Sequence, residues 1–285
     1  MNSKSYGDFR VLRNVRTQSP NHIIETTNTY EFSFDELNDQ EFSIEIRKVS
    51  FKVNSSSVKL GTAAKVIQEY TKVLSPLLFN VQQDSILLCN HEDVIERMKA
   101  KNEKLRLMPE YFIEENSDQE GDTNQYYIID HIHDHFIYLA KREGHEMAKH
   151  YLPIDYLKMV LFCIQKTKNV TTYSFPWKVG LFDHQVIWKG TKMFDPNLNM
   201  VLYTAEIEVD NQFKKKVKKT RAMFEDSLKI KINKNPITSN LTHKTEFIND
   251  GEDWDFSQTK IELQLGNLYK HHETVYISAI NSKSE

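Results

Sequence analysis

The segment from Phe42 to Leu107 constrains the fold most, because strand, helix, strand, strand and helix patterns follow one another in it without a gap. Apolar and polar side chains alternate from Phe42 to Ile46, a period of two that predicts a half-buried strand. Beyond Ile46 the apolar set moves from even to odd positions. This change of parity predicts a β-bulge near residues 47 and 48, which would restore the facing of the strand.

Two amphipathic helices are predicted in the same segment. Apolar residues recur at helical spacing from Leu60 to Leu74 and again from Val94 to Leu105. Asn90 precedes the second stripe, and its side chain is expected to accept a hydrogen bond from a backbone N–H of the first helical turn. Between the two helices, residues 77–81 and 86–89 are predicted to form a pair of strands.

The second half of the chain is rich in strand patterns. A hairpin is predicted around residues 195–199, where a proline presets one turn dihedral and asparagines tolerate the left-handed one. A helix with a basic outer face is predicted over residues 212–227. Further alternation predicts strands over residues 173–179, 228–232, 261–265 and 275–279.

These elements together predict an α+β fold, in which largely antiparallel sheets are covered by four to five amphipathic helices. A run of acidic residues separates two parts of the chain and is typical of a solvated linker. The predicted division is therefore an N-terminal arm at 1–29, an N-terminal α+β subdomain at 30–109, an acidic linker at 110–124, and a helical pair with an antiparallel β-rich subdomain at 125–285.

The composition indicates a globular protein and excludes some classes of partner. The chain has 285 residues, 39% of them hydrophobic, and a net charge of -3, which gives no global attraction for nucleic acid. No apolar leader segment and no run long enough to cross a bilayer is found, so a cytoplasmic protein without a membrane span is expected. Both cysteines, Cys89 and Cys163, are predicted to be small buried hydrophobes. The abundance of Lys, Asn and Ile suggests a bacterial origin.

Five of the eleven histidines lie within twenty residues: His131, His133, His135, His145 and His150. On a helix, His131 and His135 lie one turn apart and have the spacing of a two-imidazole metal site, which would suit a metal-dependent hydrolase. The run Asp130–His135 resembles the His-x-His-x-Asp-His motif of metallo-β-lactamase-type hydrolases, but it lacks one intervening residue. The competing interpretation is a histidine-rich polar helix face.

An aromatic concentration gives a second candidate site, made of Tyr173, Phe175, Trp177 and Trp188. Aromatic side chains on one face of a sheet can line a pocket for an apolar small molecule or an acyl chain. The same pattern is also what the core of a half-buried sheet requires. The sequence is compatible with both interpretations.

Basic residues give a third candidate, an interaction surface made of Arg10, Arg13, Arg16, Lys215, Lys218 and Lys219. No catalytic signature is found and no cofactor is predicted, which favours a non-enzymatic role. The leading hypothesis is a protein-interaction or assembly component of a larger bacterial complex, with a protein partner or a second copy of the chain bound. Nucleic acid is not expected, because no stacking aromatics are interleaved with the lysines.

Overall fold

The computed structural model describes residues 4–20, 22–38, 41–54, 58–82, 85–111, 127–142, 170–178, 185–229, 237–248 and 253–280. The chain divides into two compact units. Unit 1 comprises residues 1–12, 26–154 and 279–285, and unit 2 comprises residues 13–25 and 155–278. This division differs from the predicted one, since the boundary does not fall at the acidic segment 110–124, of which residues 112–124 lie outside the described ones.

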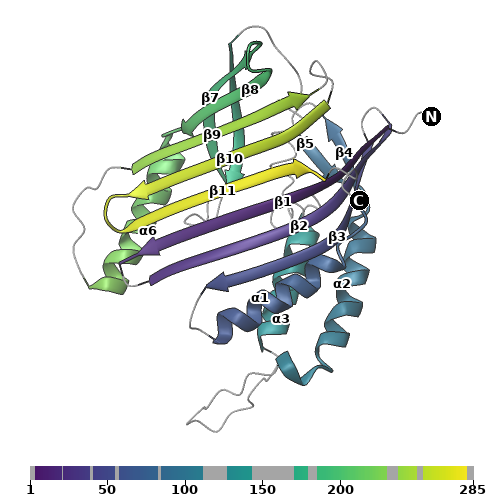
Figure 1. Cartoon of the computed structure of the whole chain (residues 1–285). Coiled ribbons are helices and arrows are strands. Elements are labelled where there is room, and N and C mark those ends of the chain that lie inside the picture. The colour runs from purple at the N-terminus through teal and green to yellow at the C-terminus, as the bar shows by residue number, and fades with distance from the viewer. Residues whose placement is uncertain are drawn as a thin grey trace. The chain divides into compact units, whose positions relative to one another are not determined.

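Strands dominate the structure (Figure 1). The strand bounds are β1 Lys4–Ser19, β2 His22–Asn38, β3 Glu41–Asn54, β4 Leu77–Gln82, β5 Ser85–Leu88, β6 Thr171–Lys178, β7 Gln185–Asp195, β8 Met200–Ile207, β9 Ile237–Ile248, β10 Asp253–Leu265 and β11 Tyr269–Ala279. Hydrogen bonds join these eleven strands in the order β5-β4-β3-β2-β1-β11-β10-β9-β8-β7-β6. The registers from β3 to β5 and from β6 to β11 along the chain are antiparallel.

The predicted α+β fold class, with sheets covered by four to five helices, is wrong. The described residues form eleven strands but four α-helices, so the fold is dominated by its sheet. The helices are α1 Val58–Lys72, α2 His91–Leu105, α3 Tyr127–Arg142 and α6 Asn211–Leu228, with a short 3-10 turn η1 at Pro109–Tyr111. Much of the difference lies in residues 1–29, which form β1 and the start of β2 instead of an arm. Their polar composition concealed these strands.

In unit 1, α1 packs against β3, and α2 and α3 pack with α1 (Figure 1). Strand β4 pairs with β3 only as far as Ile44, so the remaining β3 edge needs other hydrogen-bond partners. The Ser75 hydroxyl oxygen accepts from the Ile46 N–H at 2.8 Å, and the Gln68 side-chain oxygen accepts from the Phe51 N–H at 3.1 Å. Helix α1 and the turn after it therefore complete the edge of the sheet.

The Asn90 side chain does not cap α2, contrary to prediction. Its oxygen accepts from the Leu78 N–H at 3.0 Å and its amide donates to the Pro76 carbonyl at 2.8 Å. Arg97, two helical turns further along, donates to the Leu74 carbonyl at 2.8 Å. Both side chains of this region hold the connection between α1 and β4, because its backbone groups have no strand partner there.

The predicted hairpin around residues 195–199 is confirmed. Strands β7 and β8 pair from Asp195 with Met200 onward. An Asp195 carboxylate oxygen accepts from the N–H groups of Asn197 at 2.9 Å and Leu198 at 3.3 Å, and Asn199 has a φ of 45°. Turn chemistry of this kind depends only on neighbours in sequence, so it was readable from the sequence.

Gly190 allows β7 and β8 to approach closely. It pairs with Ala205, and a Cβ atom at position 190 would lie 1.9 Å from the Thr204 carbonyl oxygen and 2.6 Å from Ala205 Cα. The obstructing atoms belong to the backbone, so they cannot move aside as a flexible side chain would. Only a hydrogen atom fits at this position of the sheet.

We expect Gly190→Ala to lower the free energy of unfolding by roughly 3 kcal/mol, the upper end of the range for overpacking. Gly61→Ala is the matched control, because Gly61 is exposed on α1 with nothing within 4 Å of an added Cβ. This control should stabilise the protein by up to about 1 kcal/mol, since alanine favours helix. Urea denaturation measures both values, and similar small changes in the two variants would contradict the β7–β8 packing.

Candidate functional site: a basic groove beside helix α6

Local hydrogen bonding fixes where α6 begins, and its apolar residues determine which side it buries. The Asp210 carboxylate accepts from the Phe213 N–H at 2.6 Å and so caps the N-terminus, and Lys229, with a φ of 52°, ends the helix. Phe213 and Val217 lie one turn apart and are buried. These two side chains form the inward stripe of α6, as the spacing predicted.

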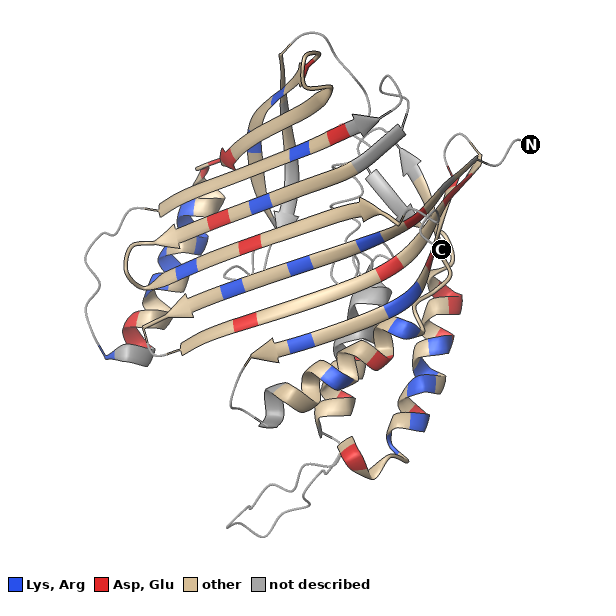
Figure 2. Ribbon diagram, viewed as in Figure 1, with Lys and Arg blue, Asp and Glu red and all other residues tan. Residues whose placement is uncertain are grey.

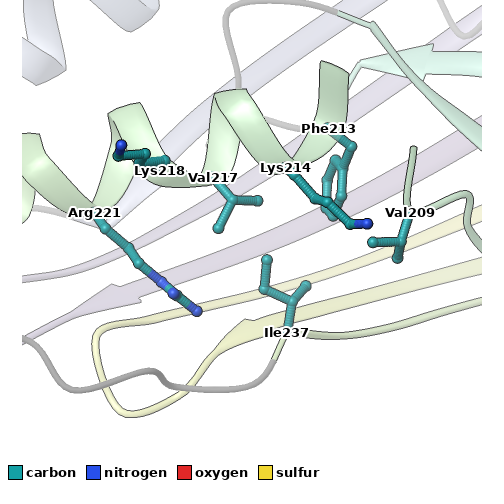
Figure 3. A pocket seen from close by; sticks show the side chains of 7 residues that line it. All are labelled: Val209, Phe213, Lys214, Val217, Lys218, Arg221 and Ile237. Carbon is teal, nitrogen blue, oxygen red and sulfur yellow. The ribbon is translucent and has the colours of Figure 1, made fainter. Parts of the chain in front are cut away.

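A groove of about 400 Å³ lies beside this stripe, within unit 2. Its lining residues are Val209, Phe213, Lys214, Val217, Lys218, Arg221 and Ile237. Figure 3 shows the apolar side chains gathered between the helix and the start of β9, with Arg221 extending toward Ile237 and Lys214 alongside Phe213. The groove therefore combines an apolar floor with a cationic rim.

The positive charge around the groove is concentrated on one helix. Helix α6 has six Lys and Arg residues and two acidic ones (Figure 2). Within the part of the chain that the structure describes, no ion pair engages Lys214, Lys215, Lys218 or Lys219. These ammonium groups are available for an external anion, and a ligand with an apolar body and an acidic group would match the groove.

The three predicted interaction arginines of β1 lie in a different setting. Each forms an ion pair with a carboxylate on a neighbouring strand: Arg10 with Glu31 at 2.8 Å, Arg13 with Glu273 at 2.7 Å, and Arg16 with Glu25 at 3.4 Å. Their charges are therefore paired within the sheet. Of the predicted lysines, Lys218 lines the groove, whereas Lys215 and Lys219 are exposed elsewhere on α6.

The predicted aromatic site is not part of this groove. Trp188 has an exposed fraction of 0%, so it belongs to the core. Its backbone partner on β6 is Phe175, and the side chains of Tyr173, Phe175 and Trp177 lie outside the described residues. The sequence pattern identified the sheet correctly here, but for Trp188 the core interpretation holds.

The predicted histidine cluster is only partly described. His131 is exposed, and the His133 ring lies against the Tyr70 ring at a centroid distance of 6.1 Å. Burial lowers the pKa of His133. The His135 side chain and residues 143–169, which include His145, His150 and Cys163, lie outside the described residues. Among the described residues no group of three His, Cys, Asp or Glu residues has the arrangement of a metal site. The metal site stays a prediction.

The sequence analysis missed a band of buried polar residues on unit 2. His243 is fully buried, and its ring nitrogens hydrogen-bond the hydroxyls of Thr259 at 2.7 Å and Thr245 at 2.9 Å. Ser257 extends this network at 3.3 Å from Thr245. These residues share the parity of the apolar ones on β9 and β10, which was the available signal. Because the network is closed to solvent and satisfies its own hydrogen bonds, it stabilises the core and does not offer a ligand site.

A second buried polar group joins β1 to β11. Glu273 is 3% exposed and accepts a hydrogen bond from Arg13, and its other oxygen lies 3.3 Å from the His271 ring. Burial and the Arg13 charge lower the pKa of His271 to about 4. Burial alone lowers the pKa of His243 to about 3. Both histidines are therefore neutral in the folded protein near pH 7. In contrast, Cys89, which was predicted to be buried, is exposed.

Comparisons with known proteins do not assign the chain to a family. No family model and no curated protein matches it. Among solved structures, it is similar to lipovitellin, described as "lipid-protein interactions in lipovitellin", at 8% identity and a TM-score of 0.41, over 98% of this chain and 26% of that one. A loop-deletion mutant of OmpT, an outer membrane protein of Vibrio cholerae, is similar at 7% identity and a TM-score of 0.18, over 97% and 99% of the two chains. With both TM-scores below 0.5, neither likeness bears on fold or function.

No helix among the described residues has the length and apolar character needed to cross a bilayer. This agrees with the prediction that the chain has no membrane span of that kind.

The neutral buried histidines predict a loss of stability in acid. Their folded pKa values lie below the unfolded value near 6.5, so between about pH 6.5 and 4 the unfolded chain binds more protons. The free energy of unfolding should fall by up to about 1.4 kcal/mol per pH unit for each histidine. We expect His243→Gln to remove the contribution of one histidine from the pH dependence of the free energy of unfolding. Urea denaturation across this pH range measures that dependence. The exposed His131→Gln is the control, and equal slopes in both variants would contradict the assignment.

Proposed function

We propose that this protein is a binding module for a small anionic amphiphile, a molecule with an apolar body and one acidic group, held in the groove beside α6. The observation that supports the proposal is the combination of an apolar floor with three cationic side chains in a groove of about 400 Å³. It develops the expectation of a binding module for an apolar small molecule or acyl chain. The proposed residues are different, since they lie on α6 and not among the aromatic residues of β6 and β7.

The apolar floor would hold the body of the ligand. Phe213 and Val217 contribute their inward stripe, and Val209 and Ile237 close the groove from outside the helix. The volume lies within the range of about 300–1,000 Å³ that is usual for small-molecule sites. Each methylene of a ligand buried there would contribute about 0.8 kcal/mol, so a short acyl chain is sufficient for measurable binding.

The cationic rim would select the acidic group. Lys214 and Lys218, which line the groove, each supply an ammonium group that can donate hydrogen bonds to a carboxylate or phosphate. Hydrogen bonds to a charged group contribute about 1.5–3 kcal/mol, so an acid should bind roughly ten to one hundred times more tightly than the alcohol of the same chain length. A purely apolar groove would not favour the acid over the alcohol, so this affinity ratio distinguishes a groove that also has cations.

The two other hypotheses stay predictions. An assembly role would need a surface other than the β1 arginines, which are paired within the sheet. A metal-dependent hydrolase would need ligands from outside the described residues. A specific observation favours the groove over both of them, namely the apolar floor of Val209, Phe213, Val217 and Ile237 directly beside the cations of α6.

The test is a calorimetric titration of the full chain with decanoate and, as the uncharged comparison, decanol. Decanoate should bind at least about tenfold more tightly. Lys214→Gln should weaken the binding of decanoate but not that of decanol, because it removes one cation and leaves the apolar floor intact. Val209→Asp should weaken it further, since Val209 is 60% exposed and tolerates a polar residue, but a carboxylate there repels the ligand.

Lys260→Gln is the matched control, because Lys260 is an exposed lysine on β10 and does not line the groove. This variant should bind decanoate as the natural chain does. The proposal is overturned if decanoate and decanol bind equally, if neither binds, or if Val209→Asp leaves decanoate binding unchanged.

A further inference from the structure

Helix α6 also has exposed basic and apolar residues on the side that does not line the groove. Lys215, Lys219 and Met223 are spaced by four residues, so they form one stripe along the helix. All three are exposed, Met223 to 62%. Since Phe213 and Val217 face inward, helical geometry places Lys215 and Lys219 on the opposite side, and the exposed Met223, two turns beyond Lys215, lies at the edge of that side.

We propose that this stripe docks the protein onto an anionic lipid bilayer, with Lys215 and Lys219 among the headgroups and Met223 at the boundary of the acyl chains. The proposal goes beyond ligand binding in the groove, because it concerns the other side of the helix and stands whether or not the groove is occupied. A basic helix that lies in the interface plane, with long side chains carrying their charges to the headgroups, is an established mode of peripheral binding.

Charge complementarity supports this partner. The whole chain has a net charge of -3, whereas α6 has six cationic residues against two acidic ones (Figure 2). An anionic surface would therefore repel the chain in most orientations and attract it through α6. Asp226 is exposed near the C-terminal end of the same side, so the attraction is confined to the earlier turns.

A bilayer fits this face better than a nucleic acid does. Single-stranded nucleic acid is held by exposed aromatic side chains on which bases stack. The aromatic residues of α6 are Phe213, which is buried, and Phe224, which is half-buried. Met223 is a large apolar side chain of α6 that is exposed, which a phosphate backbone would not use and an acyl boundary would.

The stripe and the groove are adjacent around the helix. Lys214 and Lys218 lie between the inward residue Val217 and the outward residue Lys215 in helical projection, and both line the groove. A protein docked by the outward stripe would therefore present the cationic rim close to the bilayer surface. An anionic amphiphile leaving the membrane would meet that rim first.

The test is co-sedimentation of the full chain with vesicles of phosphatidylcholine, alone or mixed with phosphatidylglycerol, at low and high salt. Binding is expected only to the mixed vesicles and should weaken at high salt, as screening requires. Lys215→Glu with Lys219→Glu should lower the partition coefficient at least about thirtyfold, because each lysine near an anionic surface contributes about fivefold and its reversal adds repulsion. Met223→Ser should give a smaller loss.

The control pair is Lys260→Glu with Lys270→Glu, which makes the same change in net charge on exposed positions of β10 and β11. It should bind the mixed vesicles nearly as the natural chain does. Equal losses in the two pairs, equal binding to both vesicle types, or binding to single-stranded RNA in place of vesicles would overturn the inference. Decanoate titration of the Lys215→Glu with Lys219→Glu variant separates the two proposals, since its groove is intact.

Discussion

Hydrogen bonding between neighbouring strands forces the residues on one side of a sheet to share one environment, and on unit 2 that side is closed to water. Tyr203, His243 and Thr259 lie opposite one another on β8, β9 and β10, and all three are buried. Any polar group in such a row must find its partner among its own neighbours, because water is excluded. The network from His243 to Ser257 meets that requirement, and so does Glu273 between Arg13 and His271.

The same constraint separates two kinds of positive charge in this protein. The β1 arginines lie opposite carboxylates of neighbouring strands, so their charge is used inside the fold. The α6 lysines lie on a helix whose inward side is already occupied by Phe213 and Val217, and they face outward. A cation that is already paired adds little to recognition, whereas an exposed cluster on a rigid helix can attract and orient an anion. This contrast is why α6, and not the N-terminal strand, carries the proposed functions.

Helix α6 buries apolar residues on one side and exposes lysines on the other. Its cap at Asp210 fixes where the helix begins, and Phe213 is buried while Lys215 is exposed. The groove lies at the flank between them, where an apolar floor and cations come together. Ligand binding and membrane docking would therefore share one helix without sharing the same residues, and each can be removed without the other.

Local chemistry let the sequence determine a good part of the structure. The 195–199 turn, the start of α6 and the alternating strands at 261–265 and 275–279 depend on residues close in the chain, and these predictions are confirmed. The strand predicted at 228–232 is wrong at Leu228, which ends α6, and residues 230–232 lie outside the described ones. The tertiary structure decided what depends on distant partners. Asn90 bonds the backbone of β4 and not that of its own helix, and the arginines of β1 find carboxylates as far away as Glu273. The groove joins α6 to Ile237, which no spacing along the chain could indicate, because only folding brings an apolar floor and a cationic rim together.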